Sequence, residues 1–116
     1  MKTELEERTK KFAVQIVKAV GCFPKTAEGQ IVGRQLLKAG TSIGANYREA
    51  NRAESKDDFI HKIGIAEKEA AETIYWLEIC QETKLGSKEI TDGLHKEAGE
   101  LLAILITIGR KTKSSR

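Results

Sequence analysis

Apolar residues recur every three or four positions along almost the whole chain, with polar and charged residues between them. This spacing is typical of helices that bury one face, because about 3.6 residues make one helical turn. No segment shows the alternation of apolar and polar residues that marks a half-buried strand. The pattern therefore predicts an all-α fold.

Capping and turn residues divide this pattern into four segments. Thr3, Ser55 and Ser87 stand where a side-chain oxygen would cap the start of a helix. Pro24 interrupts the pattern early in the chain, and Gly86 is a candidate C-cap. We expect helices at about residues 3–20, 27–53, 56–85 and 88–109.

The connections between these expected helices are short. Only about two to six residues join each helix to the next, so consecutive helices must run antiparallel. The predicted architecture is an antiparallel up-down-up-down four-helix bundle over residues 1–109. Residues 110–116 offer no apolar side chain to bury, and we expect them to form a disordered basic tail.

The composition fits a single domain that needs neither a disulfide nor a membrane. Cys22 and Cys80 are isolated thiols that form no metal-binding or redox motif. No segment reaches the roughly 18 apolar residues of a membrane span, and the charged N-terminus lacks the core of a signal peptide. We expect a cytoplasmic protein without a cofactor. The net charge of +3 is too small to identify a partner, so the distribution of charge must decide.

The second expected helix carries a different chemistry on each of its sides. At about 100° per residue, one side gathers apolar residues and Asn46, the opposite side gathers cations, and glycines fall between. The cations, which we call the basic stripe, are Arg34, Lys38, Arg48 and Arg52, and the glycines are Gly33, Gly40 and Gly44.

The basic stripe covers a helix rise of about 27 Å. Lysine and arginine side chains arranged in this way bind phosphate backbones, and repetition around an oligomer would multiply the contacts. The stripe is therefore a candidate binding site for RNA or DNA. An acidic protein partner and an ordinary solvated helix face are the two alternatives.

Three glycines inside one helix need a physical reason, since each costs about 0.5 to 1 kcal/mol relative to alanine. The expected reason is close approach of another helix, either within the same bundle or from a second subunit. Tyr75 and Trp76 offer a large apolar area for packing or for a subunit contact. We expect Asn46 to be a buried, hydrogen-bonded residue that fixes helix register, with a binding role as the alternative.

Two Asp-x-x-His pairs resemble the carboxylate and imidazole spacing of di-iron bundles. Asp58 precedes His61 in the third expected helix, and Asp92 precedes His95 in the fourth. In antiparallel helices of this length the two pairs stand roughly 40 Å apart, so they cannot share a metal. No nucleophile with a base and no phosphate-binding loop accompanies them. We expect no metal site, no catalytic residue and no enzymatic activity.

Several stretches of the chain together resemble one family of bacterial proteins. They are Phe23-Pro24-Lys25, Gln35-Leu36, residues 38–50, Ser55-Lys56-Asp57-Asp58-Phe59 and residues 69–77. These stretches resemble the four-helix bundle proteins encoded in intervening sequences of bacterial 23S ribosomal RNA genes. The resemblance covers nearly the whole chain, with Ala50 standing where many members have glycine.

This resemblance implies an assembly rather than an activity. Members look like homo-oligomeric bundles, and a pentameric ring is the expected form. The family is also similar to the accessory protein of diversity-generating retroelements, which binds nucleic acid and a reverse transcriptase. We therefore predict a non-enzymatic homopentamer that binds RNA or another nucleic acid through the basic stripe. The alternative is a protein-interaction scaffold that binds no nucleic acid, and in either case the physiological role is unknown.

Overall fold

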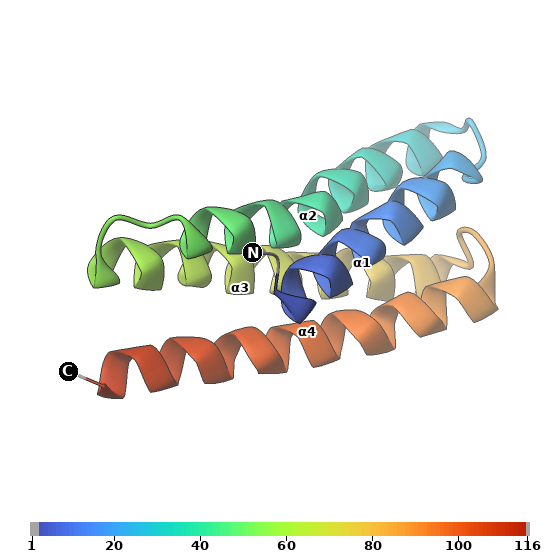
Figure 1. The fold of residues 1–116 in the computed structure, drawn as a ribbon. Helices are drawn as coiled ribbons and strands as arrows, with labels where there is room; N and C mark the ends of the chain where they lie inside the picture. Colours follow the sequence, from blue (N-terminus) through green and yellow to red (C-terminus); the bar gives the residue numbers. More distant parts are fainter. Residues whose placement is uncertain (1–2, 116) are drawn as a thin grey trace.

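Four long helices make up residues 3–115, the part of the chain that the computed structural model describes. They are α1 (Glu4–Gly21), α2 (Ala27–Asn51), α3 (Lys56–Thr83) and α4 (Lys88–Ser114). Consecutive helices run antiparallel in an elongated body of 49 × 22 × 22 Å (Figure 1). The predicted all-α, up-down-up-down four-helix bundle is confirmed.

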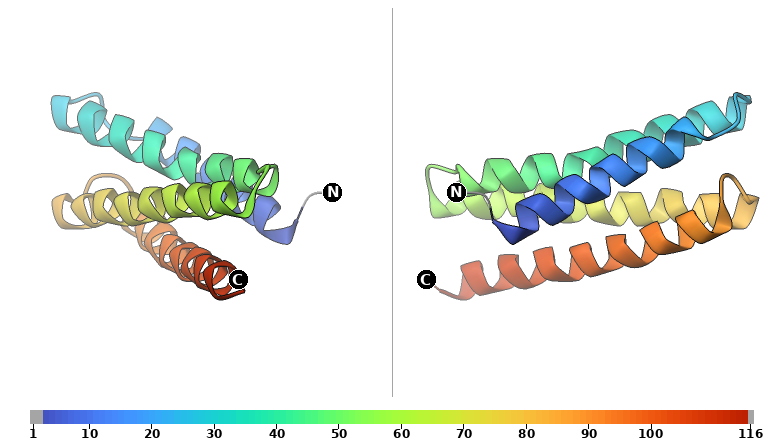
Figure 2. Two further views of the ribbon diagram at one scale, coloured as in Figure 1. Left: turned by 90° about the vertical axis from the view of Figure 1, so that its left-hand side faces the viewer. Right: turned by 45° about the vertical axis from the view of Figure 1, so that its right-hand side comes forward.

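Each helix packs against the next one in the chain, and α1 also contacts α4. With 18 residues α1 is the shortest helix, so it covers only part of the bundle. Its first turn lies near the middle of the molecule, and the end beyond it consists of α2, α3 and α4 alone (Figures 1 and 2).

The predicted N-caps are confirmed. The side-chain oxygens of Thr3, Ser55 and Ser87 each accept a hydrogen bond from the backbone N–H three residues further on. Thr26 caps α2 in the same way, with Gly29 as the donor. A Cβ atom at Gly29 would stand 2.1 Å from the carbonyl oxygen of Pro24, so only glycine fits this close approach.

Two helix ends differ from the prediction. Lys84, and not Gly86, is the C-cap of α3, with a left-handed φ of 59°. The N–H groups of Lys84 and Leu85 both donate to the carbonyl of Cys80, and this turn buries the Leu85 side chain. Burial of Leu85 therefore sets the end of the helix.

The second difference concerns the predicted basic tail, of which residues 110–114 continue α4 as helix. Lys111 and Lys113 lie in its last turn, where cations stabilise the partial negative charge of a helix C-terminus. The prediction of a disordered tail is therefore wrong for these residues. Its final residue, Arg116, lies outside the described part of the chain.

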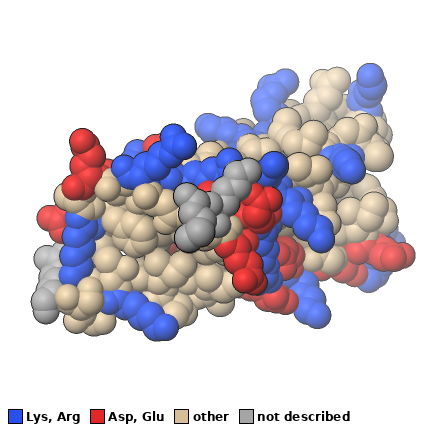
Figure 3. All heavy atoms as spheres, in the orientation of Figure 1, with Lys and Arg blue, Asp and Glu red and all other residues tan. Residues whose placement is uncertain are grey.

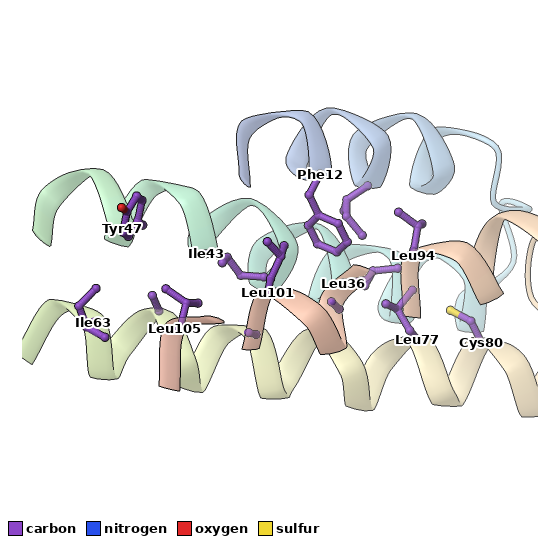
Figure 4. Packing of buried hydrophobic residues seen from close by; sticks show 14 of the residues in the cluster. Phe12, Leu36, Ile43, Tyr47, Ile63, Leu77, Cys80, Leu94, Leu101 and Leu105 are labelled. Atoms are coloured by element: carbon purple, nitrogen blue, oxygen red, sulfur yellow. The ribbon is translucent and has the colours of Figure 1, made fainter. Parts of the chain in front are cut away.

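The core is mainly aliphatic and runs along the bundle axis (Figure 4). Its largest fully buried apolar side chains are Phe12, Ile16, Leu36, Ile43, Ile63, Leu77, Leu101 and Leu105. Two apolar side chains of the amphipathic helices are instead half exposed, Val17 at 50% and Ile90 at 52%. Ile90 lines an open groove between α1 and α4, so no helix covers it.

Candidate nucleic-acid interface

The basic stripe lies along the outward side of α2. Arg34, Lys38 and Arg52 are exposed, and none forms an ion pair with another described residue. Figure 3 shows Lys and Arg side chains gathered along the upper edge of the molecule, where α2 runs. Three of the four predicted cations are therefore available to an anion.

Arg48 is the exception, because it leans against α1. Its Nε atom lies 4.0 Å from Oε1 of Glu6, and 40% of its side chain is exposed. The Nη2 atom of Arg48 is buried and has no hydrogen-bond partner among the described residues. Glu6 also accepts a hydrogen bond of 2.7 Å from Nδ2 of Asn51. Arg48 therefore supports the contact between α1 and α2, and it offers less free charge than the other three cations.

Carboxylates of α2 and α3 border the stripe on its other flank. Burial and then the neighbouring Glu72 raise the pKa of Glu69, and the nearby charge of Lys38 opposes that rise. Further along α2, Glu49 accepts a hydrogen bond of 2.9 Å from Nζ of Lys62. Lys62 and Lys68 of α3 stand beside these carboxylates, so the net positive charge is greatest on top of α2.

The middle of the stripe is small and uncharged. Thr41 and Ala45 separate the two pairs of cations, with Ser42 beside them. The hydroxyl of Thr41 donates to the carbonyl of Leu37 at 2.8 Å, and that of Ser42 donates to the carbonyl of Lys38 at 2.6 Å. Each hydroxyl has donated its only proton, so toward a ligand it can act only as an acceptor, through its lone pairs.

The three glycines of α2 face α1 of the same chain. A Cβ atom added at any of them would stand within 3.1 Å of an α1 side chain, namely Val20 for Gly33, Ile16 for Gly40 and Thr9 for Gly44. Such distances are shorter than ordinary van der Waals contact. The glycines therefore serve close packing inside the bundle, which decides between the two explanations left open by the sequence.

Asn46 is partly exposed, so the prediction of a buried polar residue is wrong. Its Nδ2 atom donates to the carbonyl of Ser42 at 2.8 Å, within the same helix. The next residue, Tyr47, faces the core instead and is 7% exposed. Adjacent residues differ by about 100° around a helix, so Asn46 and Tyr47 lie on different sides of α2, and Tyr47 is the one that packs in the core.

Tyr75 and Trp76 are adjacent on α3, and their rings form an edge-to-face pair with centroids 5.0 Å apart. Tyr75 is 55% exposed, whereas Trp76 is partly buried and packs against the core. The indole Nε1 of Trp76 is buried without a hydrogen-bond partner among the described residues. Trp76 thus stabilises the bundle, and Tyr75 is the member of the pair that offers a surface.

The residues of the two Asp-x-x-His pairs do not come together, and those of the second pair contact nearby side chains instead. Asp92 accepts hydrogen bonds from Lys88 and Gln81, and Nε2 of His95 lies 3.0 Å from Glu78. His61 is exposed. Across residues 3–115, no three His, Cys, Asp or Glu side chains are placed to hold a metal ion.

Neither cysteine takes part in a disulfide. Cys80 is buried, and burial raises the pKa of its thiol to about 11. This thiol therefore stays protonated near neutral pH and is a weak nucleophile. None of the described helices combines the length and the apolar character that crossing a membrane requires.

An open groove lies away from the stripe, between the end of α1 and the start of α4. This groove has a volume of about 670 Å³, and Ala19, Phe23, Ile90 and Leu94 are among its apolar residues. It marks the region where α1 and α4 diverge. Apolar side chains make it a candidate contact surface rather than a reaction site.

The ion pairs of Arg8, which join α1 to α4, were not predicted from the sequence. The guanidinium donates to both carboxylate oxygens of Glu97, at 2.7 and 2.8 Å, and to Glu100 at 2.7 Å. The hydrogen bond from Arg8 lowers the pKa of Glu97. The available signal was Glu97 itself, a charged residue that interrupts the apolar positions of α4.

Comparison with known proteins identifies the family of this chain. The family model described as 23S rRNA-intervening sequence protein matches residues 1–107. A crystal structure of a protein of unknown function from the S23 ribosomal protein family of Bacteroides thetaiotaomicron has a TM-score of 0.84 and 38% sequence identity. That match covers 90% of this chain and 96% of the other. No curated protein matches significantly. The chain belongs to the 23S rRNA-intervening sequence protein family.

Proposed function

We propose that this protein is a non-enzymatic, homo-oligomeric bundle that binds RNA through the basic stripe of α2. The observation that carries the proposal is the set of three exposed cations on one side of one helix, Arg34, Lys38 and Arg52. Isolated surface charges contribute little to folding. Aligned cations do attract a phosphate backbone, because each contact releases a condensed counterion.

The resemblance to the accessory protein of diversity-generating retroelements supports a nucleic-acid ligand, since that protein binds nucleic acid. Shape and charge would be read rather than base sequence, because phosphate contacts position a protein without carrying sequence information. An excess of absorbance at 260 nm in the purified protein is the expected sign of a bound nucleic acid.

Exposed apolar side chains on all four helices support self-association. They are Val14 and Val17 on α1, Ile31 on α2, Tyr75 on α3 and Ile90 on α4. Their spread over different faces suits contacts between unlike surfaces, which close into rings. A pentameric ring, as the family resemblance implies, would present five stripes to one RNA and strengthen binding by avidity. Light scattering after size-exclusion chromatography tests this assembly, and a persistent monomer contradicts it.

The stripe is tested by replacing Arg34, Lys38 and Arg52 together with Gln. Arg48 is kept, because its contact with Glu6 supports α1. We expect weaker binding to a structured RNA, with the slope of log affinity against log salt shallower by roughly 0.7 to 0.9 for each cation that no longer meets a phosphate. Unchanged melting temperature and assembly would show that only binding is affected.

A matched control carries the same charge change elsewhere. Lys18, Lys96 and Arg110 are exposed on α1 and α4, and their replacement with Gln also removes three positive charges. This control should keep most of the wild-type affinity. If both triple variants bind RNA equally weakly, the attraction is general and the stripe is not the site. If the stripe variant binds RNA as the wild type does, the protein is better explained as a scaffold for protein partners.

A further inference from the structure

The charges of the stripe fall into two pairs separated by a neutral stretch. Arg34 and Lys38 form the N-terminal pair, Arg48 and Arg52 form the C-terminal pair, and Thr41 and Ala45 lie between. The midpoints of the two pairs are 14 residues apart, which is a rise of about 21 Å along the helix. The phosphates bound by the two pairs would therefore be widely separated. The part of the ligand that faces Ala45 would carry no phosphate.

The flanks of α2 exclude one common way of holding a duplex. A helix seated lengthwise in a groove has phosphates along both of its flanks, and these require cations there. On α2 the flanks carry carboxylates or pack against neighbours, with Glu6 on the α1 side and Glu49 and Glu69 on the α3 side. The lysines on the α3 side, Lys62 and Lys68, stand beside Glu49 and Glu69, so the net positive charge is concentrated on top of the helix, near each end of the stripe. This arrangement fits a helix that crosses a groove and touches the backbone on each side of it.

The grooves of B-DNA and A-form RNA differ in depth and width, and these differences distinguish the two candidate ligands. The minor groove of B-DNA is about 6 Å wide, too narrow for two cation pairs that stand about 21 Å apart. The major groove of B-DNA is wider but about 8.5 Å deep, so short side chains such as Ala45 would bridge it without touching the bases. A-form RNA has a wide and shallow minor groove lined with 2′-hydroxyl groups. A wide, shallow groove suits two separated cation pairs with short neutral side chains between them.

The side chains between the two cation pairs suit contact with the bottom of a shallow groove. Ala45 is small and exposed, and Thr41 and Ser42 are partly exposed. Their hydroxyls already donate to carbonyls of the preceding helical turn, so their remaining lone pairs can accept a hydrogen bond from a 2′-hydroxyl. No aromatic side chain lies among the described stripe positions 34–52 on this side of α2, so stacking of single-stranded bases has no platform there.

We propose that α2 lies across the minor groove of double-stranded RNA, with its two cation pairs on the phosphates of opposite strands. This inference rests on the proposed function and names its ligand class. Arg52 is the more available member of the C-terminal pair, since Arg48 also contacts Glu6.

The first test compares ligands of one sequence and one length of about 20 base pairs. The full-length protein is titrated with the RNA duplex, the DNA duplex and the single-stranded RNA at the same salt concentration. Affinity for the RNA duplex should be at least about tenfold higher than for the other two, because only it offers the shallow groove with 2′-hydroxyls. Equal binding to all three through the stripe would overturn the duplex assignment and leave the proposed function standing.

The second test places a charge at the centre of the stripe. Ala45→Arg adds a cation where a backbone that followed the helix would place a phosphate, and the salt slope for the RNA duplex would then steepen by about 0.7 to 0.9. If α2 crosses the groove, no phosphate lies over position 45, and the slope stays as in the uncharged control Ala45→Gln. A steeper slope for Ala45→Arg alone would overturn the crossing geometry. If instead the triple stripe variant binds all three nucleic acids as the wild type does, the proposed function itself is overturned.

Discussion

The two sides of α2 differ in the size and charge of their residues, although they lie on the same helical turns. The side that faces α1 has glycines at which an added Cβ atom would press against Thr9, Ile16 or Val20, none of which is charged. The outward side has long cationic side chains, and Arg34, Lys38 and Arg52 form no ion pair with another described residue. The first side is explained by folding alone. The second is not, and for that reason we assign it to binding.

Enlarging a glycine tests the packed side and should give the largest effect. Gly44→Leu brings a side chain onto Thr9, where even a Cβ atom would stand 2.9 Å from Oγ1. We expect the free energy of unfolding to fall by about 1 to 3 kcal/mol, because the added atoms force α1 away from α2. Chemical denaturation of the purified variant measures this change.

Gly99 provides the matched control on α4. A Cβ atom at Gly99 would meet nothing within 4 Å, and the residue is exposed. Gly99→Leu should therefore leave stability unchanged or raise it, since leucine is the better helix former. If Gly44→Leu is tolerated as well as Gly99→Leu, the contrast between the two sides of α2 is not real.

The sequence was sufficient for the part of the fold that follows from each helix alone. Helical periodicity identified four amphipathic segments, and the capping oxygens of Thr3, Ser55 and Ser87 marked three of their starts correctly. These features depend on residues within a few positions of one another. They need no knowledge of the neighbouring helix.

Contacts between helices could not be predicted in this way. A helical projection gave the direction of Gly40 but not its partner Ile16, and it could not decide whether Asn46 or Tyr47 faces the core. The same limit hid the contact of Arg48 with Glu6, which lies 42 positions away in the chain. The stripe was therefore predicted as four equal cations, whereas the structure makes one of them partly structural.

Lowering the pH should weaken the contact of α1 with α4 more than its packing against the glycines of α2. The glycine-lined part of the contact with α2 has no titratable group, although Glu6 lies at its edge, whereas the contact with α4 includes the ion pair of Arg8 and Glu97. The hydrogen bond from Arg8 depresses the pKa of Glu97 in the folded state below its ordinary value of 4.5. The contribution of this pair to stability is therefore fully present above the unfolded pKa and is lost as pH falls through the folded pKa.

Glu97→Gln removes this pH-dependent contribution. At pH 7 the variant should be less stable than the wild type by up to about 1 kcal/mol, since the pair is partly solvated. The difference in melting temperature should shrink as pH falls below about 4. A difference that stays constant between pH 7 and pH 3 would show that Glu97 acts by packing rather than by charge.

The central claim, that the outward side of α2 is the binding surface, is tested most directly by mapping where RNA touches the unmodified protein. Ultraviolet crosslinking of the full-length chain to a bound RNA duplex, followed by mass spectrometry of the crosslinked peptides, gives this map. We expect the crosslinks to fall on α2 between Arg34 and Arg52 and to disappear at high salt. Crosslinks confined to the end of α4 around Lys111 and Lys113, with none on α2, would contradict the account.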